Sequence, residues 1–184
     1  MQNNKKPLLF YFKSNFIIIT IFFIIFSIYS CDQPVKRYIK IIHEYSADFG
    51  VKPTLVFAIA DIESHFNARA KSDAGAIGIM QIMPETGKWI ATRIGINDFS
   101  DNSLYDAKIN LKIGIWYLSY LLSKFDEEWQ AIAAYNAGEG RVQTWITTQS
   151  LSRDNIPFPE TKAYVAKVEK AIVRYSKKKY AAFN

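Results

Sequence analysis

The sequence has few of the side chains that hold metals or form disulfides. Among its 184 residues are one cysteine, Cys31, and two histidines, His43 and His65, which lie far apart along the chain. One cysteine cannot form an internal disulfide, and zinc sites need clustered Cys and His ligands. We therefore expect no metal and no cofactor, and a fold whose stability comes from its hydrophobic core alone.

The chain also lacks internal repeats, a period-two strand pattern of useful length and a strong charge imbalance. Its formal net charge is +6, but three positive charges, Lys5, Lys6 and Lys13, belong to the N-terminal segment. Without these three, 20 of the 23 Lys and Arg remain against 17 Asp and Glu, an excess of +3. No nucleic-acid-binding motif accompanies this excess, so we expect no nucleic-acid partner. The excess is concentrated at 177–179 and suits either a solvated helix end or an anionic cell envelope.

The longest apolar run is short for a membrane span. It extends from Phe16 to Phe26 with one interruption, Thr20, whereas a span needs about 20 residues. Basic residues before the run and a small residue after it are typical of a secretory signal. Ile-Tyr-Ser-Cys resembles a bacterial lipobox, although Tyr29 departs from its pattern. We predict a signal peptide over residues 1–30 and lipidation of Cys31, with an uncleaved anchor and ordinary secretion as alternatives that also place the protein outside the cytoplasm.

After this segment, apolar residues recur at the three- to four-residue spacing of amphipathic helices. The length suits one domain with a single sizeable core. Proline and glycine mark where the helices begin and end. We expect helices over 35–49, 53–63, 84–94 and from about 106, one that ends near 138, a turn or helix over 140–146, and a final helix over 160–175. The predicted class is all-α, with one catalytic domain over residues 31–184.

The stretch from Asp61 to Pro84 combines the end of an apolar helix with a polar, glycine-containing segment. Glu63 stands at that helix end, where desolvation by apolar neighbours favours the protonated carboxyl group. Gly75 and Gly78 allow the following backbone to fold closely over it. A carboxyl group in an apolar recess is suited to general acid catalysis. The alternative is that Glu63 only ends a helix near the surface.

Short motifs around this stretch resemble those of a known family. Glu63 with the serine after it, the GIMQ run that ends at Gln81 and the AYNAG run over 134–138 occur in order, and ETKAYV over 160–165 follows. Together they resemble the lysozyme-like soluble lytic transglycosylases, over residues 36–175. The resemblance implies the helical fold of goose-type lysozyme and the transglycosylases. It also implies cleavage of the MurNAc–GlcNAc β-1,4 bond of peptidoglycan without water, which leaves 1,6-anhydroMurNAc ends.

The implied reaction uses one carboxyl group as acid and then as base. Glu63 would protonate the leaving oxygen and then deprotonate the sugar's 6-hydroxyl group, while the N-acetyl oxygen assists at the anomeric carbon. A scarcity of second carboxylates fits this reaction, because ordinary glycosidases use two. Asp61 lies about 200° round the helix from Glu63. After Asp73, which could approach, no carboxylate occurs before Glu85.

The resemblance also implies a set of substrate-binding positions. They are Ser64, Ser72, Met80, Gln81, Met83, Tyr135, Asn136, Glu160 and Tyr164. The hydroxyl group of Tyr135 is implied to reach the catalytic glutamate. Ordinary structural roles remain open for several of them: Ser64 could end its helix, Met80 could fill the core, and Asn136 could fix the local backbone.

Two other functions remain open at this point. A goose-type lysozyme-like hydrolase would cleave the same bond and leave a reducing end. A non-catalytic peptidoglycan-binding envelope protein would keep the cleft without turnover, although a pure binding protein has no use for a buried acid. In each case the expected partners are peptidoglycan glycan strands and a membrane reached through the N-terminal lipid anchor, in the cell envelope.

Overall fold

The computed structural model describes residues 35–148 and 150–177, most of which are helical, and this confirms the all-α class. The chain divides into two compact units, Met1–Arg37 and Tyr38–Asn184. The predicted signal peptide, Cys31 and the lysines at 178 and 179 lie outside the described residues. After a helix over 35–49, the elements are α2 (Pro53–Ser64), α3 (Pro84–Arg93), η1 (Asp101–Tyr105), α4 (Ala107–Lys124), α5 (Glu128–Ala137), α6 (Glu139–Thr148), η2 (Arg153–Asn155) and α7 (Pro159–Tyr175).

Local sequence signals explain where these helices begin. Pro53, Pro84 and Pro159 each occupy the first helical position of their helix, where the missing N–H is not needed. The carboxylate of Asp106 caps α4 by accepting the backbone N–H groups of residues 108 and 109 at 2.9 and 3.0 Å. The segment before α4, for which the sequence predicted no helix, contains the short 3-10 helix η1.

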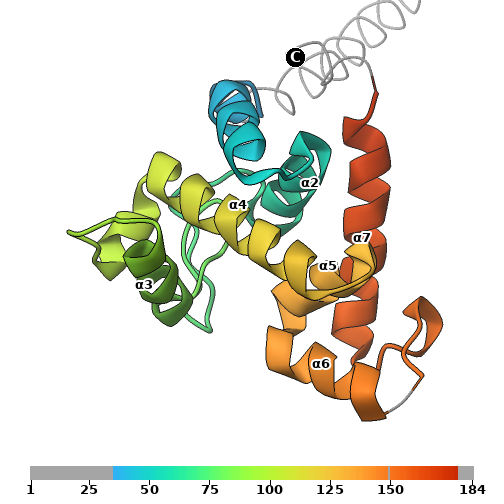
Figure 1. The fold of residues 1–184 in the computed structure, drawn as a ribbon. Helices are drawn as coiled ribbons and strands as arrows, with labels where there is room; N and C mark the ends of the chain where they lie inside the picture. Colours follow the sequence, from blue (N-terminus) through green and yellow to red (C-terminus); the bar gives the residue numbers. More distant parts are fainter. Residues whose placement is uncertain (1–34, 149, 178–184) are drawn as a thin grey trace, which may run out of the picture. The chain divides into compact units, whose positions relative to one another are not determined.

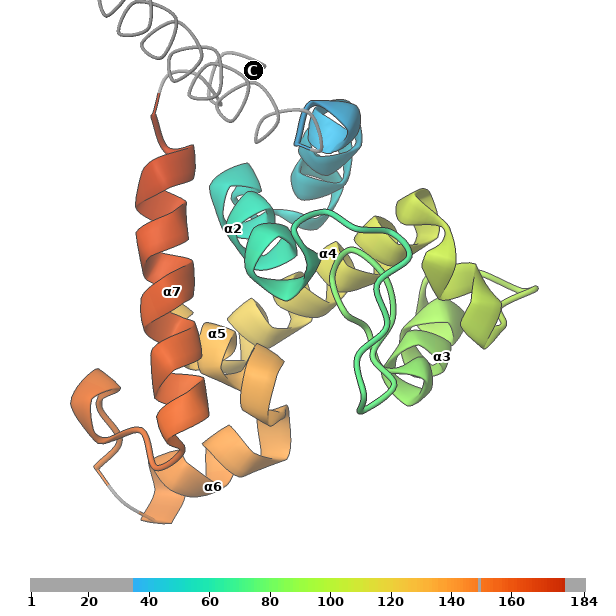
Figure 2. The same cartoon turned by 180° about the vertical axis from the view of Figure 1, so that it is seen from behind.

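The core is arranged around α2 and α4. Residues 55–60 of α2 are all at most 1% exposed. α2 packs mainly against α7, and α5 packs against α4, α6 and α7. Figure 1 shows α4 running between α3 on one side and α7 on the other, and Figure 2 shows α2 and α7 side by side from behind. In the described part of the chain, no helix is both long and apolar enough to cross a membrane.

The segment over 65–83 connects α2 to α3 and is held by a buried side chain from α4. It forms only two isolated bridges, Lys71 with Ile77 and Ile77 with Ile82, and no strand is present in the described residues. Asn110 is fully buried and accepts the N–H of Met80 at 2.8 Å. Its amide group donates to the carbonyl oxygens of Ile77 and Leu104 at 2.8 and 2.9 Å. These three bonds fix the backbone beside the end of α2.

Gly78 is required where this segment crosses Asn110. Its φ angle is +82°, a conformation that L side chains rarely adopt. A Cβ atom at this position would lie 2.3 Å from the Asn110 amide nitrogen and 2.4 Å from the Leu104 carbonyl oxygen. The close approach at this glycine is to Asn110 and Leu104, and the predicted folding of the backbone over Glu63 stays a prediction.

Candidate active site

Glu63 lies in the last turn of α2 and is largely buried. Desolvation raises the pKa of its carboxyl group from 4.5 to about 7, although a hydrogen bond from Tyr164 acts in the opposite direction. In that bond the Tyr164 hydroxyl group donates to Glu63 Oε1 at 2.5 Å. A carboxyl group with a pKa near neutrality can both give and take a proton, as acid–base catalysis requires.

The tyrosine bonded to Glu63 is not the one that the resemblance implied. The hydroxyl group of Tyr135 donates to the carbonyl oxygen of Met80 at 2.7 Å, so the expectation that it reaches Glu63 is wrong. The packing of α7 against α2 explains the difference, because it places Tyr164 beside the end of α2. Burial and the nearby Glu63 charge raise the pKa of both tyrosines well above the usual value. Both hydroxyl groups therefore stay protonated and act as donors.

A cavity of about 250 Å³ opens between the segment that leads into α3 and the junction of α5 with α6. It contains four of the predicted substrate-binding positions. Its lining residues are Gln81, Ile82, Met83, Thr86, Tyr117, Tyr135, Asn136, Ala137 and Gly138. Tyr135 lines the cavity and donates to the Met80 carbonyl oxygen, and Ser64, next to Glu63, donates to the neighbouring Ile79 carbonyl oxygen. The cavity and the end of α2 that carries the carboxyl group are therefore tied to the same short stretch of backbone. The polar and aromatic lining of the cavity suits a sugar ring.

The backbone conformation at residues 80 and 81 decides which side chain faces this cavity. Gln81 has a φ angle of +47°, and its amide group donates to the Gly78 carbonyl oxygen at 2.9 Å. Met80 is fully buried and packs against Gly114, where a Cβ atom would come within 2.4 Å of its sulfur. The prediction that the Met80 side chain binds substrate is therefore wrong, because the chain turns it into the core and turns Gln81 outward. Met83 is 42% exposed at the cavity.

The two predicted serines form hydrogen bonds within the protein. The Ser64 hydroxyl group donates to the Ile79 carbonyl oxygen at 2.7 Å and accepts the Asn67 N–H at 3.0 Å. It thereby ties the end of α2 to the following segment, which is the structural alternative considered for it. The Ser72 hydroxyl oxygen accepts the N–H of Ala76 at 3.0 Å, and its own proton remains available to a ligand.

The remaining predicted positions divide between the cavity and the surface. Asn136 lines the cavity, and its Oδ1 atom accepts the hydroxyl group of Thr161 at 2.7 Å. This bond connects α5 to the first turn of α7. Glu160 is exposed in that first turn and does not line the cavity. Its role in substrate binding stays a prediction, and its neighbour Thr161 is the residue that contacts Asn136.

In the described part of the chain, neither Asp61 nor Asp73, the two carboxyl groups nearest to Glu63 in the sequence, forms a hydrogen bond with it. Asp61 forms an ion pair with Arg174 and a hydrogen bond with His65 on another side of α2. Asp73 is exposed in the segment after α2. Among the described residues, no group of three His, Cys, Asp or Glu side chains could hold a metal ion.

The sequence reasoning missed two features of this site. It did not identify Asn110, although an asparagine on the apolar face of a predicted helix was a usable signal for a buried polar contact. It also named no aromatic residue of α4 as part of the site. Tyr117 lines the cavity and packs on Tyr135 at 5.5 Å between ring centroids, and Tyr120 donates to Glu139 at 3.0 Å. The next ring along α4, Trp116, stacks on Tyr120 at 5.7 Å.

Comparisons with known proteins agree with this geometry. The chain is 36% identical over 139 residues to the soluble lytic murein transglycosylase of Escherichia coli K12, covering 71% of this chain and 22% of that protein. It is 28% identical over 167 residues to membrane-bound lytic murein transglycosylase C of Haemophilus ducreyi, covering 76% of this chain and 46% of that protein. The chain thus spans less than half the length of these relatives.

Solved structures and a family model give the same assignment. Lytic transglycosylase Slt of Pseudomonas aeruginosa superposes with a TM-score of 0.71 at 35% identity, covering 76% of this chain and 24% of that one. The 70 kDa soluble lytic transglycosylase of Escherichia coli superposes with a TM-score of 0.72 at 33% identity, covering 80% of this chain and 25% of that one. The family model described as "Transglycosylase SLT domain" matches residues 40–156. The chain therefore belongs to the transglycosylase SLT domain family and has its lysozyme-like helical fold.

Proposed function

We propose that this protein is a peptidoglycan lytic transglycosylase, a lyase that cleaves the MurNAc–GlcNAc β-1,4 bond and leaves 1,6-anhydroMurNAc ends. Family membership and relatives named lytic murein transglycosylases support this proposal. The observation that carries it is Glu63, a largely buried carboxyl group with a pKa of about 7 beside a cavity of sugar-binding character.

The proposed reaction needs one proton donor that later becomes the acceptor. Protonated Glu63 gives its proton to the glycosidic oxygen as the bond from the anomeric carbon to that oxygen breaks. The N-acetyl oxygen of the sugar stabilises the anomeric carbon. This step leaves Glu63 as a carboxylate, which accepts the hydrogen bond of Tyr164. The carboxylate then takes the proton of the sugar's 6-hydroxyl group while the 6-hydroxyl oxygen forms its bond to the anomeric carbon. Glu63 ends protonated, and no water is consumed.

Other side chains would bind and orient the glycan strand. Gln81, Met83, Tyr135 and Asn136 contact a sugar in the cavity that they line. Ser72 is proposed to donate its free hydroxyl proton to substrate. Ser64 and the backbone of residue 80 hold the segment over the carboxyl group, and Glu160 has no part in this cavity.

A goose-type lysozyme-like hydrolase is the second candidate, because the same fold and carboxyl group would serve it. A hydrolase would use a second carboxylate near Glu63. The contacts of Asp61 with Arg174 and His65 hold that carboxylate away from Glu63 and therefore favour the lyase. Digestion of purified murein followed by mass spectrometry separates the candidates. We expect muropeptides lighter by one water than those with reducing ends. Reducing ends alone would establish hydrolysis, and intact murein would leave the envelope-binding function.

We also propose that residues 1–30 are removed as a signal peptide and that lipidated Cys31 anchors the protein to a membrane of the cell envelope. The basic, apolar, Ile-Tyr-Ser-Cys order of the N-terminal segment supports this proposal. Mass spectrometry of the mature N-terminus tests it. An unmodified Cys31, or a retained N-terminal segment, would contradict it.

Replacing Tyr164 by phenylalanine should alter the pH profile of the reaction. The Tyr164 hydroxyl group stabilises the ionised form of Glu63, so its loss raises the pKa of that carboxyl group further. We expect activity to persist to higher pH, with turnover lowered by the roughly 1–3 kcal/mol of a lost buried hydrogen bond. Tyr135→Phe is the matched control, because its hydroxyl group bonds Met80 instead. If activity of Tyr164→Phe fell at the same high pH as in the wild type, the hydrogen bond would not set the pKa of Glu63.

A further inference from the structure

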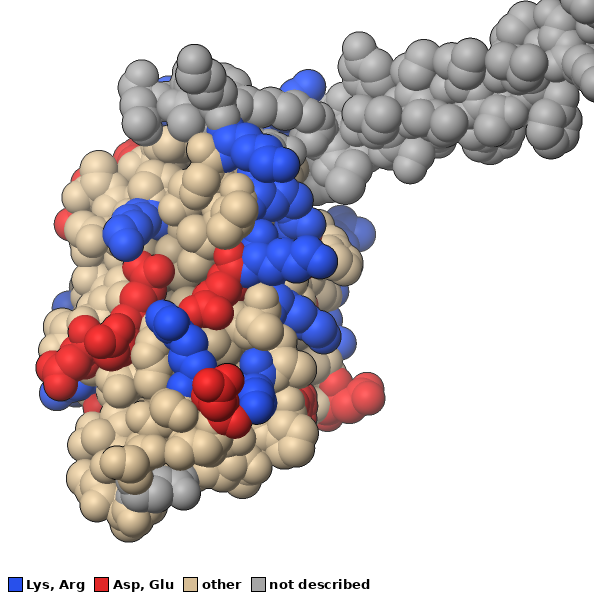
Figure 3. Space-filling view, turned by 90° about the vertical axis from the view of Figure 1, so that its right-hand side faces the viewer, with Lys and Arg blue, Asp and Glu red and all other residues tan. Residues whose placement is uncertain are grey.

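A basic groove lies along α7 where this helix passes Ile62 of α2. It has a volume of about 460 Å³ and is lined by Ile62, Lys167, Lys170, Ala171, Val173, Arg174 and Lys177. None of these residues lines the cavity beside Glu63. The four basic residues are spaced three, four and three apart, so they form one stripe along the helix. Figure 3 shows Lys and Arg side chains side by side in a column on this side of the molecule.

Three of the four charges in this basic groove have no partner among the described residues. Arg174 pairs with Asp61. The other acidic residue nearby on α7, Glu169, pairs with Arg153. Lys167, Lys170 and Lys177 are exposed, and no described side chain forms an ion pair or hydrogen bond with them. The groove therefore presents three ammonium groups to an anionic partner.

Apolar side chains lie within the same basic groove. Val173 is 67% exposed, although it is a large apolar residue among lysines. Ile62 and Ala171 form the floor beside it. A soluble polyanion would gain nothing from these side chains. The boundary between lipid headgroups and acyl chains offers both phosphate and hydrocarbon, so it fits lysines around an exposed valine.

The position of the groove also suits a membrane. The ring of Phe57 packs against His43 of the first described helix at 5.8 Å and against Tyr175 of α7 at 5.5 Å. The first helix and the C-terminal end of α7 therefore lie at the same end of the domain, as Figures 1 and 2 show. An anchor attached before the first helix would hold this end near the bilayer.

We propose that the basic groove docks the domain on a bilayer surface that contains anionic lipids. The ammonium groups of Lys167, Lys170 and Lys177 contact lipid phosphates, and Val173 enters the headgroup boundary. Docking leaves the cavity beside Glu63 open, because the two share no residue. This inference does not depend on the proposed reaction.

A fluorescent probe in the groove tests the proposal on the full chain. Cys31→Ser together with Val173→Cys leaves one thiol, to which an environment-sensitive dye is attached. The N-terminal apolar run and its lysines are retained in every variant, so any insertion through them is common to the groove variant and its control. We expect a blue-shifted emission with vesicles that contain phosphatidylglycerol and none with pure phosphatidylcholine. High salt should reverse the shift, because it screens exposed charges.

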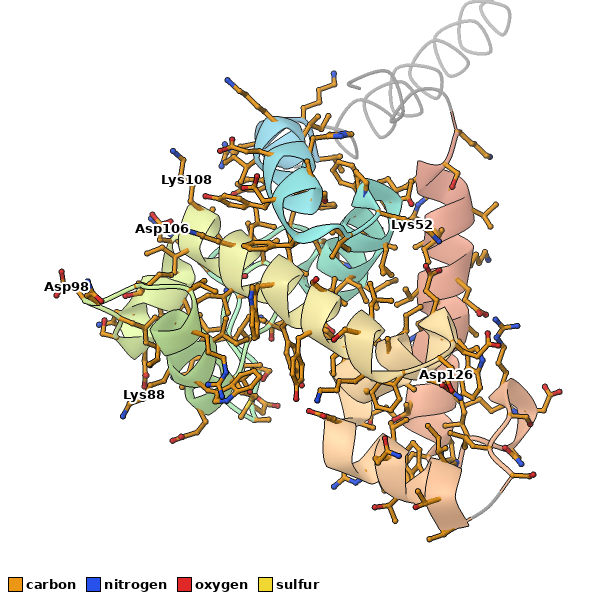
Figure 4. The ribbon with its side chains drawn as sticks, in the orientation of Figure 1. Lys52, Lys88, Asp98, Asp106, Lys108 and Asp126 are labelled. Carbon is orange, nitrogen blue, oxygen red and sulfur yellow. The ribbon has the colours of Figure 1, made fainter. Side chains whose placement is uncertain are left out.

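Charge reversal identifies the residues responsible. Lys167→Glu, Lys170→Glu and Lys177→Glu together should raise the anionic lipid concentration for half-maximal response by at least about 100-fold, given the typical contribution of each lysine. The matched control reverses Lys71, Lys88 and Lys108, which are exposed on other elements. Figure 4 labels two of these, Lys88 on α3 and Lys108 on α4, away from α7. Equal thermal midpoints show that both variants fold.

Three outcomes would overturn the proposal. The probe could respond equally to neutral and anionic vesicles, or the α7 variant could respond like its control. The probe could also respond to soluble polyglutamate and not to vesicles, which would make the groove a site for a soluble polyanion.

Discussion

Glu63→Gln is expected to slow the release of anhydro-muropeptides by at least about 10²–10⁴-fold, the usual contribution of general acid–base catalysis. Glutamine keeps the shape of the side chain and can still accept the hydrogen bond of Tyr164. It can neither give a proton to the leaving oxygen nor take one from the 6-hydroxyl group. Because one group serves both steps in the proposed reaction, no other side chain compensates.

The same substitution should stabilise the protein at neutral and higher pH. The pKa of Glu63 is 4.5 in its ordinary state and about 7 in the folded protein. Between these values the folded state binds more protons than the unfolded state, so the free energy of unfolding decreases as pH rises through this window. Above pH 7 the loss in the free energy of unfolding caused by ionised Glu63 no longer changes with pH, and it amounts to roughly 3 kcal/mol. Glu63→Gln removes this loss, and the advantage should vanish below pH 4.5.

Thermal midpoints and product release measured on one preparation separate catalysis from structure. The alternative that Glu63 only ends a helix predicts an unstable glutamine variant whose activity follows its folded fraction. A folded, stable variant that releases product near the wild-type rate would remove Glu63 from the mechanism. Tyr135→Phe is a useful comparison, because it alters the same site without removing the proposed acid.

Asn110→Ala is expected to have the largest effect on stability. Its side chain is fully buried and makes three hydrogen bonds to the backbone of residues 77, 80 and 104. Alanine removes the partner of the Met80 N–H and of the Leu104 carbonyl oxygen, at a cost of about 1–3 kcal/mol each, whereas the Ile77 carbonyl oxygen keeps the N–H of Ile82 at 3.0 Å. The total is a large part of the roughly 5–15 kcal/mol that stabilises a typical domain. Urea unfolding followed by circular dichroism measures the loss.

Ser119→Ala provides the matched control on the same helix. Its hydroxyl group makes a single hydrogen bond, to the Phe49 carbonyl oxygen at 2.7 Å. We expect this variant to lose about 1 kcal/mol. If Asn110→Ala were as mild as Ser119→Ala, other contacts would hold the segment over 65–83, and Asn110 would not position the site.

The helices and the position of Glu63 could be predicted because both depend on neighbours in the sequence. Pro53, Pro84 and Pro159 begin their helices through their own backbone geometry. The apolar run of residues 55–60, which are all at most 1% exposed, indicated that the end of this helix meets the core. Short-range spacing therefore determined the all-α class and indicated the raised pKa of this carboxyl group.

The partners of these residues were decided by tertiary packing. Tyr164 reaches Glu63 across 101 positions, and the bonds of Asn110 to residues 77 and 80 cross about 30. The same packing turned Met80 into the core, gave Tyr135 a backbone partner and placed Ile62 beside the lysines of α7. Helical periodicity specifies which face of a helix is apolar. It does not specify which other helix covers that face, because that choice depends on how all the helices together fill the core.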